Sequence, residues 1–359
     1  MKPPRDLLRQ LPTSVERLRD ELSDDPAEYL IKAFPEVAAA EPVGDQPLAM
    51  AELPLPEAEL NLERERVEVL RAGSRGLEKI AADGEDADLA ADEAFALEAI
   101  IMLEGRPAIF IQDGHFFPAP GDWHALEEQR AAIETVCRSV GRVEVTGHPS
   151  YDWVGTGFLV APDVIMTNRH VAEVFCETLN GRKWRFKMGM TSRVDYVEEL
   201  NAVTSAEFAL TEVVGIHRAF DMALLRVAQT SSGGGPSPAP LPVSATPPST
   251  TQDHQVYAVG YPAWDGRRND PQEMMRIFAN VFNVKRLLPG EITHYLPQGV
   301  FMHDCSTLGG NSGSCVVDLE THRVLGLHFG GRYLEGNYAV ALWQLTGDPL
   351  LQLAQVHFQ

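Results

Sequence analysis

The feature that most constrains this chain is the pattern of its second half, where short apolar runs alternate with Gly, Pro, Asn or Asp from about Val140 onward. These runs are rich in Val, Ile, Phe and Thr, which favour extended backbone. Helical periodicity returns only at residues 343–356. Many short strands separated by turn residues are typical of a β-barrel or β-sandwich. The sequence therefore predicts a mainly β fold that ends in a C-terminal helix.

The apolar runs divide into two groups of similar size. Between them, residues 231–251 carry six prolines and no charged side chain, which predicts a linker between two β halves. We expect strands over residues 143–146, 157–160, 164–167, 183–188, 208–216, 222–227, 256–259, 277–284, 300–303, 315–317, 324–328 and 338–342.

The front of the chain has a different character. Residues 1–130 hold 13 Lys and Arg against 29 Asp and Glu, a net charge of -16, out of -21 for the whole chain of 359 residues. Helices are predicted after the capping pair Thr13-Ser14 and over residues 57–80, and a short strand over 108–112. We expect an acidic, mainly helical module over 1–130 and the β part over 131–359. The acidic surface is either a solvated helical face or a docking surface for a basic partner.

Composition excludes several classes of protein. No apolar window is long enough for a membrane span, and the polar start, Met1 to Gln10, does not resemble a secretion signal. We therefore expect a cytoplasmic location. The acidic balance, without a basic patch, disfavours nucleic-acid binding. The four cysteines form no CxxC pair, which argues against a zinc ribbon, so no metal site is predicted.

Three segments carry residues suited to nucleophilic catalysis. His170 follows the predicted strand over 164–167, Asp221 directly precedes the next buried strand, and Ser312 lies in the glycine-rich turn Leu308-Gly-Gly-Asn-Ser-Gly-Ser. Taken singly, His170 and Asp221 are better explained by structural roles, and Ser312 is equally well explained by one. Together they supply a nucleophile, a base that takes its proton and a carboxylate that orients the base. The chain order His, Asp, Ser is that of chymotrypsin-type enzymes.

Residues from about 140 to 343 resemble the trypsin-like serine peptidases, in the bacterial branch of the glutamyl endopeptidases. The resemblance rests on the Thr-Asn-X-His-Val segment, matched by 167–171, and on Gly-Gly-Asn-Ser-Gly-Ser, matched by 309–314. It implies a chymotrypsin-type double β-barrel. It also implies that Ser312 is the nucleophile, His170 the general base and acid, and Asp221 the orienting carboxylate. The amides of Gly310 and Ser312 would form the oxyanion hole.

The same resemblance implies a primary substrate pocket. Ser306 stands where trypsin has an aspartate, so a preference for Arg or Lys is not expected. Thr307 and His328, the latter in the segment Gly-Leu-His-Phe-Gly-Gly that contains Gly330, match the residues with which glutamyl endopeptidases meet a substrate carboxylate. An imidazole beside a hydroxyl is a suitable receptor for an anion. The alternative is that His328 is a wall residue of the barrel and that the pocket has another shape.

The predicted function is thus an intracellular serine endopeptidase that acts on protein or peptide substrates, needs no cofactor and is controlled by its N-terminal module. Family members complete their carboxylate site with a freed α-amino group, which here would require cleavage near the junction. Cys315 replaces the proline usual in the family, and its pairing with Cys305 stays open. The alternative function is a non-catalytic or activator-dependent scaffold or binding protein that recruits a partner through the barrel and the acidic module.

Overall fold

The computed structural model describes residues 106–119, 123–179, 183–250, 253–263, 278–279, 281–296, 298–332 and 336–359, together with the single residues 75, 79 and 90. The predicted helix after Thr13-Ser14 lies outside these residues, and of the helix over 57–80 only Arg75 and Lys79 are described, both helical. The chain divides into two compact units. The second comprises Arg106–Ala119, Trp123–Pro271 and Val281–Gln359, and everything below concerns that unit.

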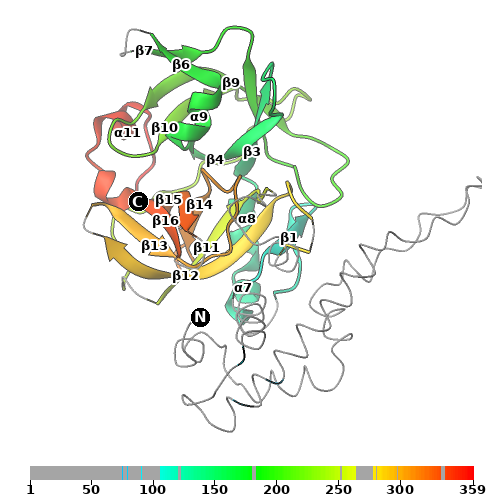
Figure 1. Ribbon diagram of the computed structural model, residues 1–359, viewed down its shortest axis with the longest axis vertical. Coiled ribbons are helices and arrows are strands. Elements are labelled where there is room, and N and C mark those ends of the chain that lie inside the picture. Colours follow the sequence, from blue (N-terminus) through cyan, green and yellow to red (C-terminus); the bar gives the residue numbers. More distant parts are fainter. Residues whose placement is uncertain are drawn as a thin grey trace, which may run out of the picture. The chain divides into compact units, whose positions relative to one another are not determined.

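The first half of this unit forms a closed six-stranded barrel (Figure 1, cyan to green) in the order β10-β5-β4-β3-β8-β9. All its neighbouring strands are antiparallel. The strands are β3 (Val140–Thr146), β4 (Trp153–Ala161), β5 (Val164–Thr167), β8 (Thr191–Asp195), β9 (Glu207–Ile216) and β10 (Ala223–Val227). Helix α9 (Arg169–Phe175) and a hairpin of β6 (Cys176–Leu179) and β7 (Lys183–Phe186) follow β5.

The second half closes in the same way. Its strands run β11-β14-β15-β16-β13-β12, and the pairing of β11 with β12 completes a second ring of six (Figure 1, yellow to red). The strands are β11 (His254–Gly260), β12 (Arg286–Leu296), β13 (Val300–His303), β14 (Cys315–Asp318), β15 (Val324–Arg332) and β16 (Gly336–Ala341). The predicted mainly β, double-barrel fold is confirmed.

The predicted strand over 108–112 is confirmed as β1 (Ile109–Gln112), which turns back at Asp113 and Gly114 into β2 (His115–Phe116). β1 pairs with β12 of the second barrel. Helices α7 (His124–Glu128) and α8 (Arg130–Cys137) follow in the same unit. The barrel unit therefore starts at Arg106, and residue 130 lies inside it, because the extension pairs with the barrel's own sheet.

The proline-rich segment between the barrels is packed rather than free. Leu241 and Val243 are buried, and their amides donate to the carbonyls of Leu159 at 2.8 Å and His357 at 2.9 Å. The amide of Gln359 in turn donates to Val243. This segment connects the barrels and also ties the end of the chain to both of them.

Two predicted elements differ from the structure. The helix over 343–356 is instead a 3-10 turn, η2 (Leu342–Leu345), followed by α11 (Pro349–Leu353), because Pro349 disfavours helical backbone at Asp348, which caps the second helix. The strand predicted over 277–284 is also wrong: within its described residues the backbone is not extended, and the strand begins at Arg286. Pro289 and Gly290 lie within β12, and because both residue types are unfavourable in strands, residue propensities do not predict this strand.

The four cysteines are all free and all buried, so Cys305 and Cys315 do not form a disulfide. Burial raises the pKa of Cys137 and of Cys176 to about 12. Burial likewise raises the pKa values of the Cys305 and Cys315 thiols. These side chains are therefore protonated, unreactive parts of the core. Among the described residues, no helix is long and apolar enough to cross a membrane.

Candidate active site

His170 and Asp221 meet on the first barrel. His170 lies in the first turn of α9, and Asp221 lies in the turn between β9 and β10. The imidazole Nδ1 is 2.6 Å from Asp221 Oδ2, and the His170 amide donates to Asp221 Oδ1 at 3.0 Å. One carboxylate thus holds both the ring and the backbone of the histidine. This contact leaves Nε2 as the ring nitrogen that can exchange a proton with a third group.

The charge state of Asp221 suits this contact. Partial burial alone would raise its pKa, but the hydrogen bonds and the positive field of His170 outweigh burial, so the pKa of Asp221 is lowered overall. The carboxylate is therefore ionised at neutral pH and accepts the Nδ1 proton of the ring.

Ser312 comes from the second barrel, in the turn before β14. Its carbonyl oxygen accepts a hydrogen bond of 2.9 Å from the amide of Thr156, on β4 of the first barrel. A Cβ atom on Gly155 would approach both the Ser312 carbonyl oxygen, at 2.9 Å, and Val171 Cγ2, at 2.8 Å. Gly155 thus separates Ser312 from the residue that follows His170. The turn that carries Ser312 therefore contacts the first barrel, which carries the His170 and Asp221 pair.

The serine turn requires its glycines. Gly310 has a φ of +86°, and a Cβ atom there would approach Trp153 Cη2 and the Tyr261 carbonyl to 2.5 Å. Gly313 has a φ of +92°, and a Cβ atom would collide with the carbonyl of Thr156. Only glycine fits both the backbone and the space at these two positions.

Two amides of this turn are left available. Those of Asn311, Gly313 and Ser314 donate to backbone carbonyls. The amides of Gly310 and Ser312 find no acceptor within the part of the chain that the structure describes. Two free donors beside a serine hydroxyl are what a developing oxyanion requires.

Two of the predicted pocket residues, Ser306 and Thr307, already form hydrogen bonds within the protein. The Ser306 hydroxyl donates to the carbonyl of Arg106 at 2.6 Å, and that of Thr307 donates to Asn337 Oδ1 at 2.6 Å. The Asn337 amide donates to the Cys305 carbonyl at 2.7 Å, which fixes its orientation. Gly330, on β15, faces open space, since a Cβ atom there would meet nothing within 4 Å.

His328 is fully buried and is paired with a second histidine. Its Nδ1 lies 3.2 Å from His303 Nε2, on β13. Burial lowers the pKa of His303 to about 3, and burial together with His303 and His170 lowers the pKa of His328 well below its usual value. Both rings are therefore neutral. The backbone carbonyl of His328 also accepts a hydrogen bond of 3.0 Å from the amide of Gly313, the residue after Ser312.

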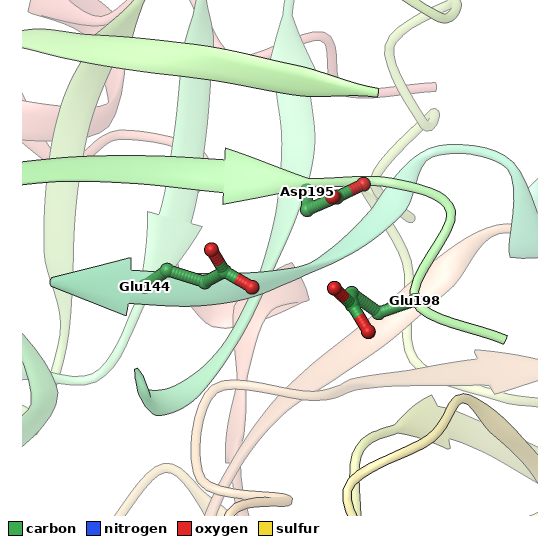
Figure 2. Close-up of side chains that lie close together, drawn as sticks. All are labelled: Glu144, Asp195 and Glu198. Atoms are coloured by element: carbon green, nitrogen blue, oxygen red, sulfur yellow. The ribbon is translucent and has the colours of Figure 1, made fainter. Parts of the chain in front are cut away.

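A separate acidic cluster lies on the first barrel. Figure 2 shows Glu144 on β3, Asp195 at the end of β8 and Glu198 just beyond. One carboxylate oxygen from each lies within 4.8 Å of the others. The Arg142 guanidinium bridges Glu144 and Glu198, and Arg193 pairs with Glu144 at 2.6 Å. These cations offset most of the negative charge, so we assign the cluster a structural role.

Several contributors to the site were not predicted. His303 ends a predicted strand, but nothing in its sequence neighbourhood indicates that it pairs with His328. Asn337 and Thr156 act through contacts made between strands distant in sequence.

The chain is similar in sequence to known peptidases. A family model described as the trypsin-like peptidase domain matches residues 155–327. A protein named "Probable serine protease" from Lysobacter enzymogenes is 31% identical over 311 residues, covering 77% of this chain and 79% of that protein. The glutamyl endopeptidase of Staphylococcus aureus is 27% identical over 212 residues, covering 58% of this chain and 57% of the relative.

Solved structures of proteases are also similar. The serine endoprotease from Yersinia pestis aligns with 16% identity and a TM-score of 0.43, covering 66% of this chain and 68% of that chain. The active form of the Rv3671c protease from M. tuberculosis aligns with 20% identity and a TM-score of 0.41, covering 64% of this chain and 86% of that chain.

Proposed function

This chain belongs to the trypsin-like serine peptidases and is a serine endopeptidase acting on protein or peptide substrates, and from that premise we propose that Ser312, His170 and Asp221 carry out the reaction through an acyl-enzyme. The observation that supports this assignment best is the hydrogen-bonded His170 and Asp221 pair beside a serine turn with two free amides. The assignment needs no metal or organic cofactor.

The steps follow from these positions. Ser312 Oγ attacks the carbonyl carbon of the substrate while His170 Nε2 takes the hydroxyl proton, and the amides of Gly310 and Ser312 bind the oxyanion. Ionised Asp221 stabilises the imidazolium that forms. His170 then gives the proton to the leaving amine, which departs and leaves an ester on Ser312. Water, activated by the same imidazole, hydrolyses the ester.

For the residue before the scissile bond, we propose a preference for glutamate, received by Thr307 and His328 with Gly330 leaving room for the side chain. The support is the hydroxyl of Thr307, already bonded to a side-chain carbonyl oxygen, and the open space at Gly330. A substrate carboxylate oxygen would replace Asn337 Oδ1 as the acceptor. Because His328 is neutral, recognition would rely on hydrogen bonds rather than on a full positive charge.

This preference is tested by digesting a peptide library with the full chain and reading the new termini by mass spectrometry. We expect cuts after Glu, and in Thr307→Val a fall in kcat/KM for Glu peptides of about 10- to 100-fold, the worth of one hydrogen bond to a charged group. For peptides with Ala before the scissile bond, kcat/KM should change little in Thr307→Val. Thr321→Val, at an exposed threonine, is the matched control. Cuts after other residues would reject the Glu pocket and leave the catalytic residues in place.

We further propose that the residues before Arg106 restrain the peptidase unit. The support is the position of Arg106, whose guanidinium bonds Asp304 at 2.7 Å and Glu291 at 3.0 Å and whose carbonyl accepts the Ser306 hydroxyl. The first residue of the unit, Arg106, is thus bonded to Asp304 and Ser306, which lie shortly before Thr307 of the proposed pocket.

The test compares the full chain with one that begins at Arg106, which keeps β1 and its pairing with β12. With active sites counted by a serine-reactive probe, we expect the shorter chain to have the higher kcat/KM. Equal values would reject the restraint. A third chain beginning at residue 131 is the control for losing β1 and should be less stable than the chain beginning at Arg106.

A further inference from the structure

The turn that carries Asp221 is organised by the ring of His217. Its Nδ1 accepts hydrogen bonds from the amides of Ala219 at 3.1 Å and Phe220 at 2.8 Å. A ring nitrogen that accepts two amide hydrogens carries no proton of its own. The proton of the neutral ring therefore lies on Nε2, which is 3.1 Å from Asp348 Oδ2.

Asp348 anchors this ring to the end of the chain. It is the N-cap of α11, where its Oδ1 accepts from the amides of Leu350 at 2.9 Å and Leu351 at 3.2 Å. Its other oxygen remains for His217. One carboxylate thus joins the C-terminal helix to the turn before β10.

Arg169 holds the same turn from the side of α9. Its guanidinium donates to the carbonyl oxygens of His217 and of Phe220, the latter at 2.7 Å. The neighbouring Asn168 donates to the carbonyl of Asp221 at 2.9 Å. Three consecutive residues, Asn168 to His170, therefore all form hydrogen bonds with the turn that carries Asp221.

The paired side chains themselves are not held by burial. The side chain of His170 is 49% exposed and that of Asp221 is 29% exposed. Because the pair is partly solvated and Asp221 lies on a turn, the backbone of that turn must be fixed if the two groups are to stay in contact.

We propose that Arg169 and His217, with Asp348 as the anchor of His217, are positioning residues that keep the Asp221 carboxylate on His170. The proposal rests on the proposed function. Loss of either anchor lets the Asp221 turn move, so that the imidazolium formed in each turnover is less well stabilised. We expect the effect in kcat rather than in KM, because the turn acts on the imidazolium that forms during turnover.

Arg169→Met in the full chain removes the donors and keeps the length of the side chain. We expect kcat per titrated active site to fall about 10- to 100-fold with KM nearly unchanged, and the acidic limb of the kcat/KM profile to move to lower pH. The matched control is Arg218→Met, at an exposed arginine of the same turn. A purely structural role would lower the melting temperature and the fraction of active sites but would move neither kcat per site nor the acidic limb.

The His217 variants test the second anchor independently. Asn at 217 can accept the amides two and three residues on, as in an Asx turn, whereas Ala cannot. We expect His217→Ala to lower kcat about tenfold and His217→Asn to recover most of that loss. Asp348→Asn keeps a good helix cap, but its amide nitrogen cannot accept a hydrogen bond from His217 Nε2. Its kcat should lie between those of His217→Ala and His217→Asn.

The outcomes separate the proposal from its premise. If the unmodified chain hydrolyses peptides while Arg169→Met and His217→Ala match Arg218→Met in kcat and in pH profile, the positioning role is rejected and the proposed function stands. If the unmodified chain is neither labelled by a serine-reactive probe nor active on any peptide, the proposed function and the positioning role fall together.

Discussion

Replacement of Ser312 by alanine is expected to abolish peptide hydrolysis, with kcat reduced about 10⁶-fold, as for removal of the nucleophile from a catalytic triad. Without Oγ no acyl-enzyme forms, and the remaining oxyanion donors and binding contacts support only slow attack by water. The measurement is hydrolysis of the best library peptide by the full chain, together with stoichiometric labelling by a fluorophosphonate.

A second serine in the same turn provides the control. Ser314 is buried, and its hydroxyl has no hydrogen-bond partner among the described residues, so Ser314→Ala should keep both labelling and activity. Equal melting temperatures for Ser312→Ala and the unmodified chain would show that the loss is chemical. Undiminished labelling of Ser312→Ala would mean that another residue is the nucleophile.

The stability of the folded chain is expected to fall steeply in mild acid because of the buried histidine pair. Burial lowers the pKa of His303 to about 3, against about 6.5 in an unfolded chain. Below pH 6.5, His303 binds a proton in the unfolded chain but not in the folded chain. The free energy of unfolding therefore decreases as the pH falls towards 3, and this loss is absent above pH 6.5.

The expected size approaches about 1.4 kcal/mol per pH unit for His303 and amounts to about 2 kcal/mol between pH 6.5 and 4.5, a change of roughly 50-fold in the unfolding equilibrium. His328 contributes with the same sign, since its pKa is also lowered. Urea unfolding at several pH values measures this slope directly.

Carboxylates also contribute to acid sensitivity, so the prediction is made as a difference. His303→Gln keeps a hydrogen-bonding group next to His328. It should reduce the difference in bound protons between the unfolded and folded chains by nearly one, and so flatten the plot of unfolding free energy against pH. His294→Gln, the same change at an exposed position on β12, should leave the slope as it is. Identical slopes for the two variants would mean that His303 is protonated in the folded chain.

Much of the fold could be predicted because most strands of the barrels are continuous apolar runs. β5 and β13 begin and end where the sequence predicts. β8, Thr-Ser-Arg-Val-Asp, was missed because its polar residues reflect pairing inside a sheet rather than local preference. The start of the unit at Arg106 could not be predicted, since it depends on β1 finding β12 about 180 residues later in the chain.

The site divides in the same way. His170, Asp221 and Ser312 stand in local motifs whose residue types suffice to suggest the chemistry, and the structure pairs His170 with Asp221. The groups that hold them, such as Thr156 behind Ser312 and Asp348 behind His217, act across more than a hundred residues of sequence. Such contacts exist only after folding, and a single sequence holds no local sign of them.

The buried cysteines make the molecule a reporter of its own opening. Each thiol is enclosed and protonated in the closed molecule, so an alkylating reagent can reach it only in molecules that have locally or globally opened. Cys176 lies on the hairpin beside the first barrel, whereas Cys315 lies on β14 of the second. The order in which the two positions become modified would therefore tell which barrel opens first, without any label added to the chain.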